Sequence, residues 1–279
     1  MIGFRSMGCD VVLSDGADTS AVRELFDARD QRFSRFIEGS ELNAVNACPL
    51  GVMVLSEELS SMLLLAIDAA RATGGLVTPA VGGALLRAGY DRDSAALPAD
   101  GEPVEPARTP SLDSLSLRGR VLLRTEPVVL DLNGVVKSKT VDDALVLLGS
   151  GWVTAGGDIA TTVPIQVGLP GGGTVTLDGG GLATSSVAVR AWRRGGETQH
   201  HLIDPATGTP ARTPWRDVTV AAENCVAADV AAKAALLLGP AGPSWLDRRN
   251  LPGRFVTHRG AVHVNETWRW LAAEARAAA

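Results

Sequence analysis

The feature that most constrains the fold is a run of short β-type segments between residues 152 and 222. The segments lie near 152–155, 164–168, 174–178, 183–193, 198–203 and 216–222, and glycine-rich turns separate several of them. Too few helical segments lie between them to supply the crossovers that a parallel sheet requires. The pattern therefore predicts an α+β fold, with a mixed, largely antiparallel sheet and helices packed on it.

Helical patterns flank and follow this run. Residues 20–37 place apolar side chains on one face, and a second helix is expected to begin after Ser56, a natural N-cap, and to end at Gly74. A later helix is expected at about 227–238. Residues 96–115 carry four prolines, which predicts a surface loop or linker. We expect residues 1–279 to form a single domain of two closely joined lobes.

Composition excludes several classes of function. The net charge of −5 gives no broad basic surface, so we expect no nucleic-acid partner. No apolar run reaches the about 18 residues that a membrane span needs. The three cysteines are odd in number and widely spaced, which predicts buried free thiols. The N-terminal segment does not have the pattern of a signal peptide, and we expect a cytoplasmic protein.

Three blocks carry residues suited to phosphate or nucleotide chemistry. Lys137 precedes a helix and could place a charge on a phosphate, or simply be exposed. Gly156 and Gly157 allow close backbone approach by a ligand, although a plain hairpin turn has the same pattern. Thr184 and Ser185 follow a glycine triplet, and their hydroxyls could bind phosphate or lie on a sheet surface.

Two further blocks carry candidate acid–base and charged groups. His201 runs into a turn at 204–208 and is a candidate proton acceptor, or a structural histidine. Asp229 and Lys233 are four residues apart on a predicted helix, so they can pair. The single tyrosine, Tyr90, could stack on a ligand ring or be a lone surface aromatic residue.

The order and spacing of these blocks resemble the ApbE-type FAD:protein FMN transferases. That family shows a block like DLGGIAKGYAVD, then GGD, TSG, HIIDPxTG and ADALATA. The matching blocks are 131–142, 156–158, 184–185, 201–208 and 228–229. Upstream, RSMGCDVVL, GSELNAVN and GGLVTPAVGGALL resemble three more family segments, with Thr78 and Ala80 where the family has Asp and Thr. The likeness extends from about residue 4 to about residue 239.

The resemblance implies an activity and a set of site residues. Such enzymes bind FAD with a divalent metal, usually Mg²⁺, split its pyrophosphate, transfer FMN to a threonine hydroxyl of a partner protein and release AMP. By resemblance the catalytic residues are His201 and Asp229, and Lys233, which stands at the position of a family threonine, is counted with them. The flavin-binding residues implied are Met7, Ser40, Glu41, Asn43, Lys137, Asp142, Gly156, Gly157, Asp158, Thr184, Ser185, Asp204 and Thr207.

One residue departs from the family pattern in a way that matters for the metal. The family places Asp and Thr four residues apart, and both bind the metal; here Asp229 remains and Lys233 replaces the threonine. A protonated lysine is no ligand for Mg²⁺ and repels it, so we expect metal binding to be weakened or replaced. Three interpretations stay open: a transferase with lysine in place of, or beside, the metal; a flavin-nucleotide-binding module without transfer activity; and an FAD pyrophosphate hydrolase.

Overall fold

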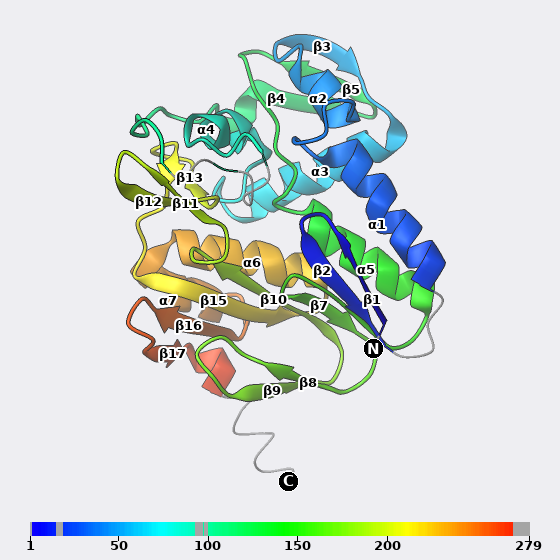
Figure 1. The fold of residues 1–279 in the computed structure, drawn as a ribbon, viewed down its shortest axis with the longest axis vertical. Coiled ribbons are helices and arrows are strands. Elements are labelled where there is room, and N and C mark those ends of the chain that lie inside the picture. Colours follow the sequence, from blue (N-terminus) through cyan, green and yellow to red (C-terminus); the bar gives the residue numbers. More distant parts are fainter. Residues whose placement is uncertain (1, 15–18, 93–96, 98–99, 270–279) are drawn as a thin grey trace. The chain divides into compact units, whose positions relative to one another are not determined.

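The computed structural model describes residues 2–14, 19–92, 97 and 100–269. The chain divides into two compact units, which are described separately (Figure 1). The first unit contains Met1–Arg23, Lys137–Ala188 and Arg212–Ala279, and the second contains Glu24–Val136 and Val189–Ala211. Helix α1 (Thr19–Phe33) begins in the first unit and ends in the second.

An eight-stranded sheet forms the centre of the first unit, in the order β1-β2-β6-β7-β10-β15-β16-β17. Every neighbouring pair in it is antiparallel. The strands are β1 (Ile2–Ser6), β2 (Cys9–Leu13), β6 (Trp152–Ala155), β7 (Asp158–Thr161), β10 (Gly180–Ser186), β15 (Trp215–Ala222), β16 (Gly253–Thr257) and β17 (Val262–Val264). A separate hairpin pairs β8 (Ile165–Gly168) with β9 (Thr174–Leu177). The predicted α+β class with a largely antiparallel sheet is confirmed, although the sheet is not mixed, since all its described strand pairs are antiparallel.

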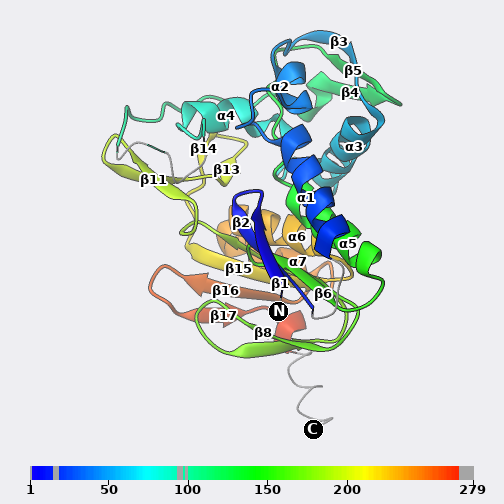
Figure 2. The same ribbon diagram turned by 45° about the vertical axis from the view of Figure 1, so that its right-hand side comes forward.

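Helices α5 (Val136–Leu148), α6 (Cys225–Leu237) and α7 (Gly242–Asp247) belong to the first unit, apart from Val136 at the start of α5. Helix α6 packs against β10 and β15, which Figures 1 and 2 show from two directions. A Cβ atom at Gly181 would collide with the backbone at Asn224 and Cys225. Glycine at this point of β10 therefore lets the start of α6 approach the sheet closely.

The second unit contains helices and small antiparallel sheets. Its helices are α2 (Glu41–Asn46), α3 (Glu57–Ala72) and α4 (Gly82–Arg87), with short 3₁₀ turns η1 (Pro79–Val81) and η3 (Leu112–Ser114). One sheet has the order β3 (Gly51–Val54), β5 (Val121–Arg124) and β4 (Leu115–Arg118). Two hairpins follow, β11 (Ala191–Arg194) with β12 (Glu197–His200), and β13 (Ile203–Asp204) with β14 (Thr209–Pro210).

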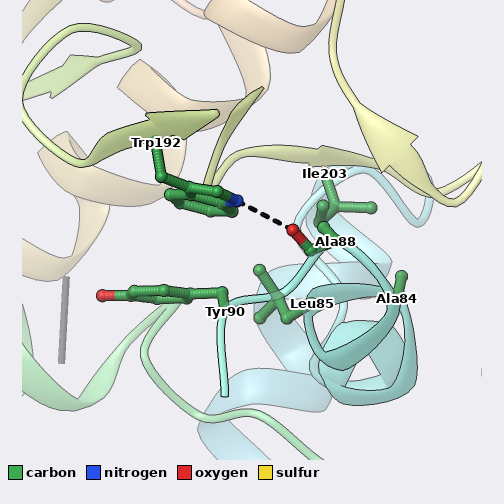
Figure 3. Packing of buried hydrophobic residues seen from close by; sticks show 6 residues of the cluster. All are labelled: Ala84, Leu85, Ala88, Tyr90, Trp192 and Ile203. Atoms are coloured by element: carbon green, nitrogen blue, oxygen red, sulfur yellow. Dashed lines mark hydrogen bonds between the residues drawn. The ribbon is translucent and has the colours of Figure 1, made fainter. Parts of the chain in front are cut away.

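Aromatic packing holds the hairpin region of the second unit to α4. The ring of Tyr90 stacks on that of Trp192, with centroids 5.0 Å apart and planes inclined by 12° (Figure 3). The Trp192 indole Nε1 donates a hydrogen bond of 2.8 Å to the carbonyl of Ala88. Leu85 and Ile203 complete the cluster with other apolar side chains. Tyr90 is buried, so its interpretation as a surface aromatic is wrong: its ring packs inside this unit.

Several local predictions can be compared directly with the structure. Ser56 caps α3 by accepting from the backbone N–H of Leu59, as its sequence position predicted. Cys9 and Cys225 are buried free thiols, whereas Cys48 is exposed, so the prediction fails for that residue. The described residues between 97 and 111 form no helix or strand, consistent with a loop; positions 96, 98 and 99 lie outside the described residues.

Candidate functional site

Four charged side chains meet in the first unit, and we call them the Lys–Asp cluster. They are Lys137 in the first turn of α5, Asp158 at the start of β7, and Asp229 and Lys233 one turn apart on α6. The Nζ of Lys137 lies 2.8 Å from Oδ2 of Asp158, and Lys233 forms an ion pair with Asp229. Three sequence blocks that are far apart in the chain thus supply one charged cluster.

The two kinds of charge in this cluster differ in their access to solvent. The Asp158 and Asp229 side chains are 1% and 4% exposed, while those of Lys137 and Lys233 are 20% and 14% exposed. The ammonium-bearing side chains are therefore the accessible members, and the carboxylates are almost fully enclosed. Of the four side chains, those of the lysines are thus the more exposed to an approaching anion.

The turn between β6 and β7 brings Asp158 into place. Gly156 and Gly157 both have a positive φ, of 55° and 96°, which favours glycine. A Cβ atom at Gly156 would lie 2.9 Å from Cβ of Cys9 and 3.6 Å from Nζ of Lys137. The hairpin interpretation of this turn is confirmed, and the glycine is needed because Cys9 and Lys137 lie directly against the backbone.

Burial and neighbouring charges shift the pKa values within the cluster. Burial, with the nearby Asp229 carboxylate, raises the pKa of Asp158 to about 6, although Lys137 and Lys233 lower it in part. Burial by itself would lower the pKa of Lys137, but the carboxylates of Asp158 and Asp229 outweigh it, and the net shift is upward. Both shifts favour the protonated form of their own group, and the cluster becomes positive only as the pH falls below about 6, where Asp158 is protonated.

The buried carboxylates retain unused acceptor capacity. Among the described residues, neither oxygen of Asp158 has a hydrogen bond of good geometry, and Oδ2 of Asp229 has no hydrogen-bond partner. Lys137 therefore contacts Asp158 chiefly as a charge. Buried acceptors of this kind are costly unless a water or a ligand donates to them.

These residues do not fit a Mg²⁺ site. Within the described part of the chain, no group of three or more His, Cys, Asp and Glu side chains is arranged to hold a metal ion. Each of the two carboxylates in the cluster already faces an ammonium group. A divalent cation would have to displace Lys233 and remain beside it, because lysine offers no lone pair while protonated.

Asp142 and Cys225 lie close to the cluster but have structural partners. Both carboxylate oxygens of Asp142, on α5, accept backbone N–H groups at the start of α6, from Cys225 at 2.8 Å and from Val226 at 3.0 Å. The carboxylate thus ties one helix to the N-terminus of the other. Burial raises the pKa of the Cys225 thiol, and the carboxylates of Asp158 and Asp142 raise it further. The thiol therefore stays protonated and unreactive.

The remaining candidates of the first unit lie on strands and turns. Thr184 shares a hydrogen bond of 2.8 Å with Thr219 on the neighbouring strand, and Ser185 is buried in β10. Met7 occupies the β1–β2 turn with a positive φ of 50°, unusual for a residue with a side chain. A role of these residues in flavin binding stays a prediction.

In the second unit, the two adjacent histidines have different environments. His200 is buried: its Nδ1 accepts from the N–H of Leu202, and its Nε2 is 3.0 Å from the carbonyl of Ala211. This pattern requires a proton on Nε2 and indicates a neutral, structural imidazole. His201 is half-buried, with its ring centroid 6.5 Å from that of Tyr90. His201 is therefore the more accessible of the pair.

Several hydrogen bonds hold the turn that follows His201 in shape. Oδ1 of Asp204 accepts from the N–H of Ala206 at 2.9 Å, and the backbone carbonyl of Asp204 accepts from the N–H of Gly208 at 2.8 Å. The Thr207 hydroxyl bonds to Thr209, and Gly208 has a φ of 64°. The expectation that Asp204 and Thr207 shape this turn is confirmed by these bonds.

A cleft of about 420 Å³ opens beside this turn, within the second unit. Its wall includes Thr78, Arg108, Pro205 and Ala206. The hydroxyl of Thr109 donates to the carbonyl of Pro205 at 2.6 Å and ties the wall loop to the turn. The family-like segment around Thr78 and the turn therefore border the same hollow.

Three other candidates of the second unit stabilise its local structure. Ser40 caps α2 by accepting from the N–H of Asn43, and Asn43 donates to the carbonyls of Arg35 and Ile37. Glu41 accepts from the backbone and the hydroxyl of Ser56. Contact of these three side chains with flavin stays a prediction.

Two buried arginines with structural partners were not predicted from the sequence. Arg35 forms a buried ion pair with Asp131, and Arg124 is 1% exposed and donates to the carbonyls of Val45 and Val128. Asp131 lies in a family-like block, but nothing in the sequence marks its partner, 96 positions away.

Of the candidate catalytic groups, His201 lies in the second unit, whereas Asp229 and Lys233 lie in the first.

No helix among the described residues combines the length and apolar character needed to cross a membrane.

The model of the ApbE family matches residues 7–255. A protein of Treponema pallidum named FAD:protein FMN transferase is 28% identical over 262 residues, covering 79% of this chain and 72% of that protein.

Two crystal structures show the same fold. An ApbE protein of Thermotoga maritima has a TM-score of 0.82 at 25% identity, covering 97% of this chain and 98% of that one. The apo form of the flavinyl transferase ApbE of Pseudomonas stutzeri has a TM-score of 0.78 at 19% identity, covering 97% and 95%. The family match spans most of the chain, and the chain belongs to the ApbE family.

Proposed function

We propose that this protein is an FAD:protein FMN transferase, which moves FMN from FAD to a threonine hydroxyl of a partner protein. Family membership supports the reaction, and the Treponema relative bears this name. The observation that carries the proposal is the Lys–Asp cluster, whose lysines are accessible and whose carboxylates are enclosed. Such a surface is suited to an anionic pyrophosphate.

The proposed chemistry is a phosphoryl-type transfer. The oxygen of the acceptor threonine attacks the phosphorus on the FMN side of FAD and forms a new P–O bond. The bond from that phosphorus to the bridging oxygen breaks, and AMP leaves with the electron pair. Positive charge near the phosphates stabilises the leaving group and the transition state.

The threonine hydroxyl must also lose its proton. His201 is the proposed acceptor on the family resemblance; its side chain is half-buried, and it precedes the hydrogen-bonded turn at 204–208. A neutral imidazole takes up a proton near neutral pH. His200 is unsuited to this role, since both its ring nitrogens contact the backbone.

A direct test combines the purified protein with FAD and a domain that bears the acceptor threonine. The expected result is a mass increase of the acceptor equal to FAD minus AMP, that is, one FMN less one water, with one AMP released per acceptor labelled. AMP and free FMN without labelling would indicate a hydrolase instead, and FAD binding without products would indicate a binding module. Either of these results would refute the transferase proposal.

A matched pair of variants localises the reaction. Lys137→Met removes an ammonium group of the cluster, and we expect it to lower the transfer rate by about 100-fold or more, because a charge that neutralises phosphate is lost. Lys139→Met is the control on the same helix, where the lysine pairs with Asp143 one turn away. Equal rates in the two variants would argue against a role of the cluster.

The compartment of the protein stays a prediction. Its three cysteines are free, which suits the reducing cytoplasm that we expect from the sequence. Fractionation of cells that express the full chain would test this expectation.

A further inference from the structure

Lys233 occupies the position on α6 from which a cation can act on a bound anion. Its ammonium group forms an ion pair with Asp229 one turn earlier, and its side chain is 14% exposed. The ammonium group carries three N–H donors, of which Asp229 uses one in the observed contact. The remaining donors can point to oxygens of a phosphate that reaches the cluster.

Asp229 anchors this ammonium group rather than offering a metal site. Its carboxylate is 4% exposed, and Oδ1 is the atom that contacts Lys233. Two carboxylates and two ammonium groups make the Lys–Asp cluster neutral as a whole. A divalent cation added to it would leave a charge of +2 in a largely enclosed space, without a third acidic ligand among the described residues.

We propose that the Lys233 ammonium group serves as a built-in cation for the pyrophosphate, so that this protein transfers FMN without a divalent metal. The proposal rests on the proposed function and specifies how its site neutralises charge. In the transfer, Lys233 donates to the oxygens of the leaving AMP phosphate as the bridging P–O bond breaks. The ammonium group keeps its protons throughout, so no further reactant is needed.

Metal binding can be measured separately from activity. Titration of the wild-type protein with MgCl₂ or MnCl₂ in a calorimeter is expected to give no saturable heat, with or without FAD. Saturable binding of one Mg²⁺ per chain would overturn the proposal, even if transfer proved undetectable. Absence of FMN transfer to the acceptor would refute the transferase proposal but would not change the metal titration. Failure of the transferase proposal and failure of the metal-free proposal are therefore distinguishable.

The activity assay then tests the same point. Addition of EDTA is expected to change the wild-type transfer rate by less than about twofold, and added Mg²⁺ is not expected to raise it. A loss of about tenfold or more in EDTA, restored by Mg²⁺, would overturn the proposal.

Substitution of Lys233 provides the complementary measurement. Lys233→Thr removes the ammonium group and supplies a hydroxyl, and we expect FAD affinity without metal to fall by about tenfold and Mg²⁺ binding to become measurable. Lys139→Thr is the matched control, because Lys139 also pairs with an aspartate four residues away but on the more exposed α5 surface. If Lys233→Thr binds FAD as tightly as the control in EDTA, the proposal is wrong.

Discussion

Substitution of Asp142 tests whether its carboxylate has a structural role or a ligand-binding role. The two oxygens accept from the N–H groups of Cys225 and Val226, at the first turn of α6. A hydrogen bond to a charged group contributes about 1.5–3 kcal/mol, and a negative charge at a helix N-terminus adds about 0.3–1 kcal/mol. Burial opposes this gain and is the largest cause of the net upward shift of the Asp142 pKa, although both backbone bonds lower it.

We therefore expect Asp142→Ala to lower the free energy of unfolding by about 3 kcal/mol. For a chain of this size that corresponds to a fall in Tm of about 6–12 °C. Asp142→Asn keeps one acceptor and should cost about 1–2 kcal/mol. Urea and thermal unfolding followed by circular dichroism measure both variants.

The neighbouring Asp143→Ala serves as the control, because Asp143 pairs with Lys139 near the surface. We expect it to change stability by less than about 0.5 kcal/mol. Equal stability losses for the Asp142 and Asp143 variants would refute the reasoning. Folded Asp142→Asn should also bind FAD with unchanged affinity, and a loss of more than about tenfold would show that the carboxylate contacts the ligand.

Three further changes test the structure elsewhere. The folded state raises the pKa of Asp158 from 3.8 to about 6, so its ionised form costs stability. As the pH rises from about 3 to about 7, the wild type should lose about 3 kcal/mol relative to Asp158→Asn, and parallel pH profiles would contradict this. Trp192→Ala removes the stack on Tyr90 and should cost about 3–5 kcal/mol in urea unfolding, whereas a loss below about 1 kcal/mol would mean that the stack contributes little. Gly208→Ala, at a φ of 64°, places a Cβ against the backbone carbonyl of Ala107. It should destabilise the protein more than Gly75→Ala, where φ is 87° but the surrounding space is open. The reverse order of Tm in thermal unfolding would count against the close approach of the Ala107 loop to the turn.

Local patterns in the sequence were sufficient to predict several elements. Helix α3 begins after Ser56, and α6 covers the predicted 227–238 region to within a few residues. The strand at 152–155 was predicted with its observed bounds. These elements were predictable because capping, helical periodicity and strand alternation depend on neighbours within a few residues.

The candidate site was predictable only where its contacts are local. The pair Asp229–Lys233 follows from a spacing of four residues on one helix. The contact of Lys137 with Asp158 joins two elements, and its formation depends on the packing of α5 against the β6–β7 turn. The interpretation of Tyr90 as a surface residue failed for the same reason, since its partner Trp192 is remote in sequence.

The sequence by itself determined the α+β class, the main helices and strands, and the residue types that carry the family chemistry. Only the tertiary structure decided that Asp142 accepts from the N–H groups at the start of α6, and that the carboxylates of the Lys–Asp cluster are more deeply buried than its lysine side chains. The physical reason is that hydrogen bonding and the burial of charge depend on which groups, remote in sequence, come into contact. Those contacts are set by the packing of whole helices and strands, which no short stretch of sequence specifies.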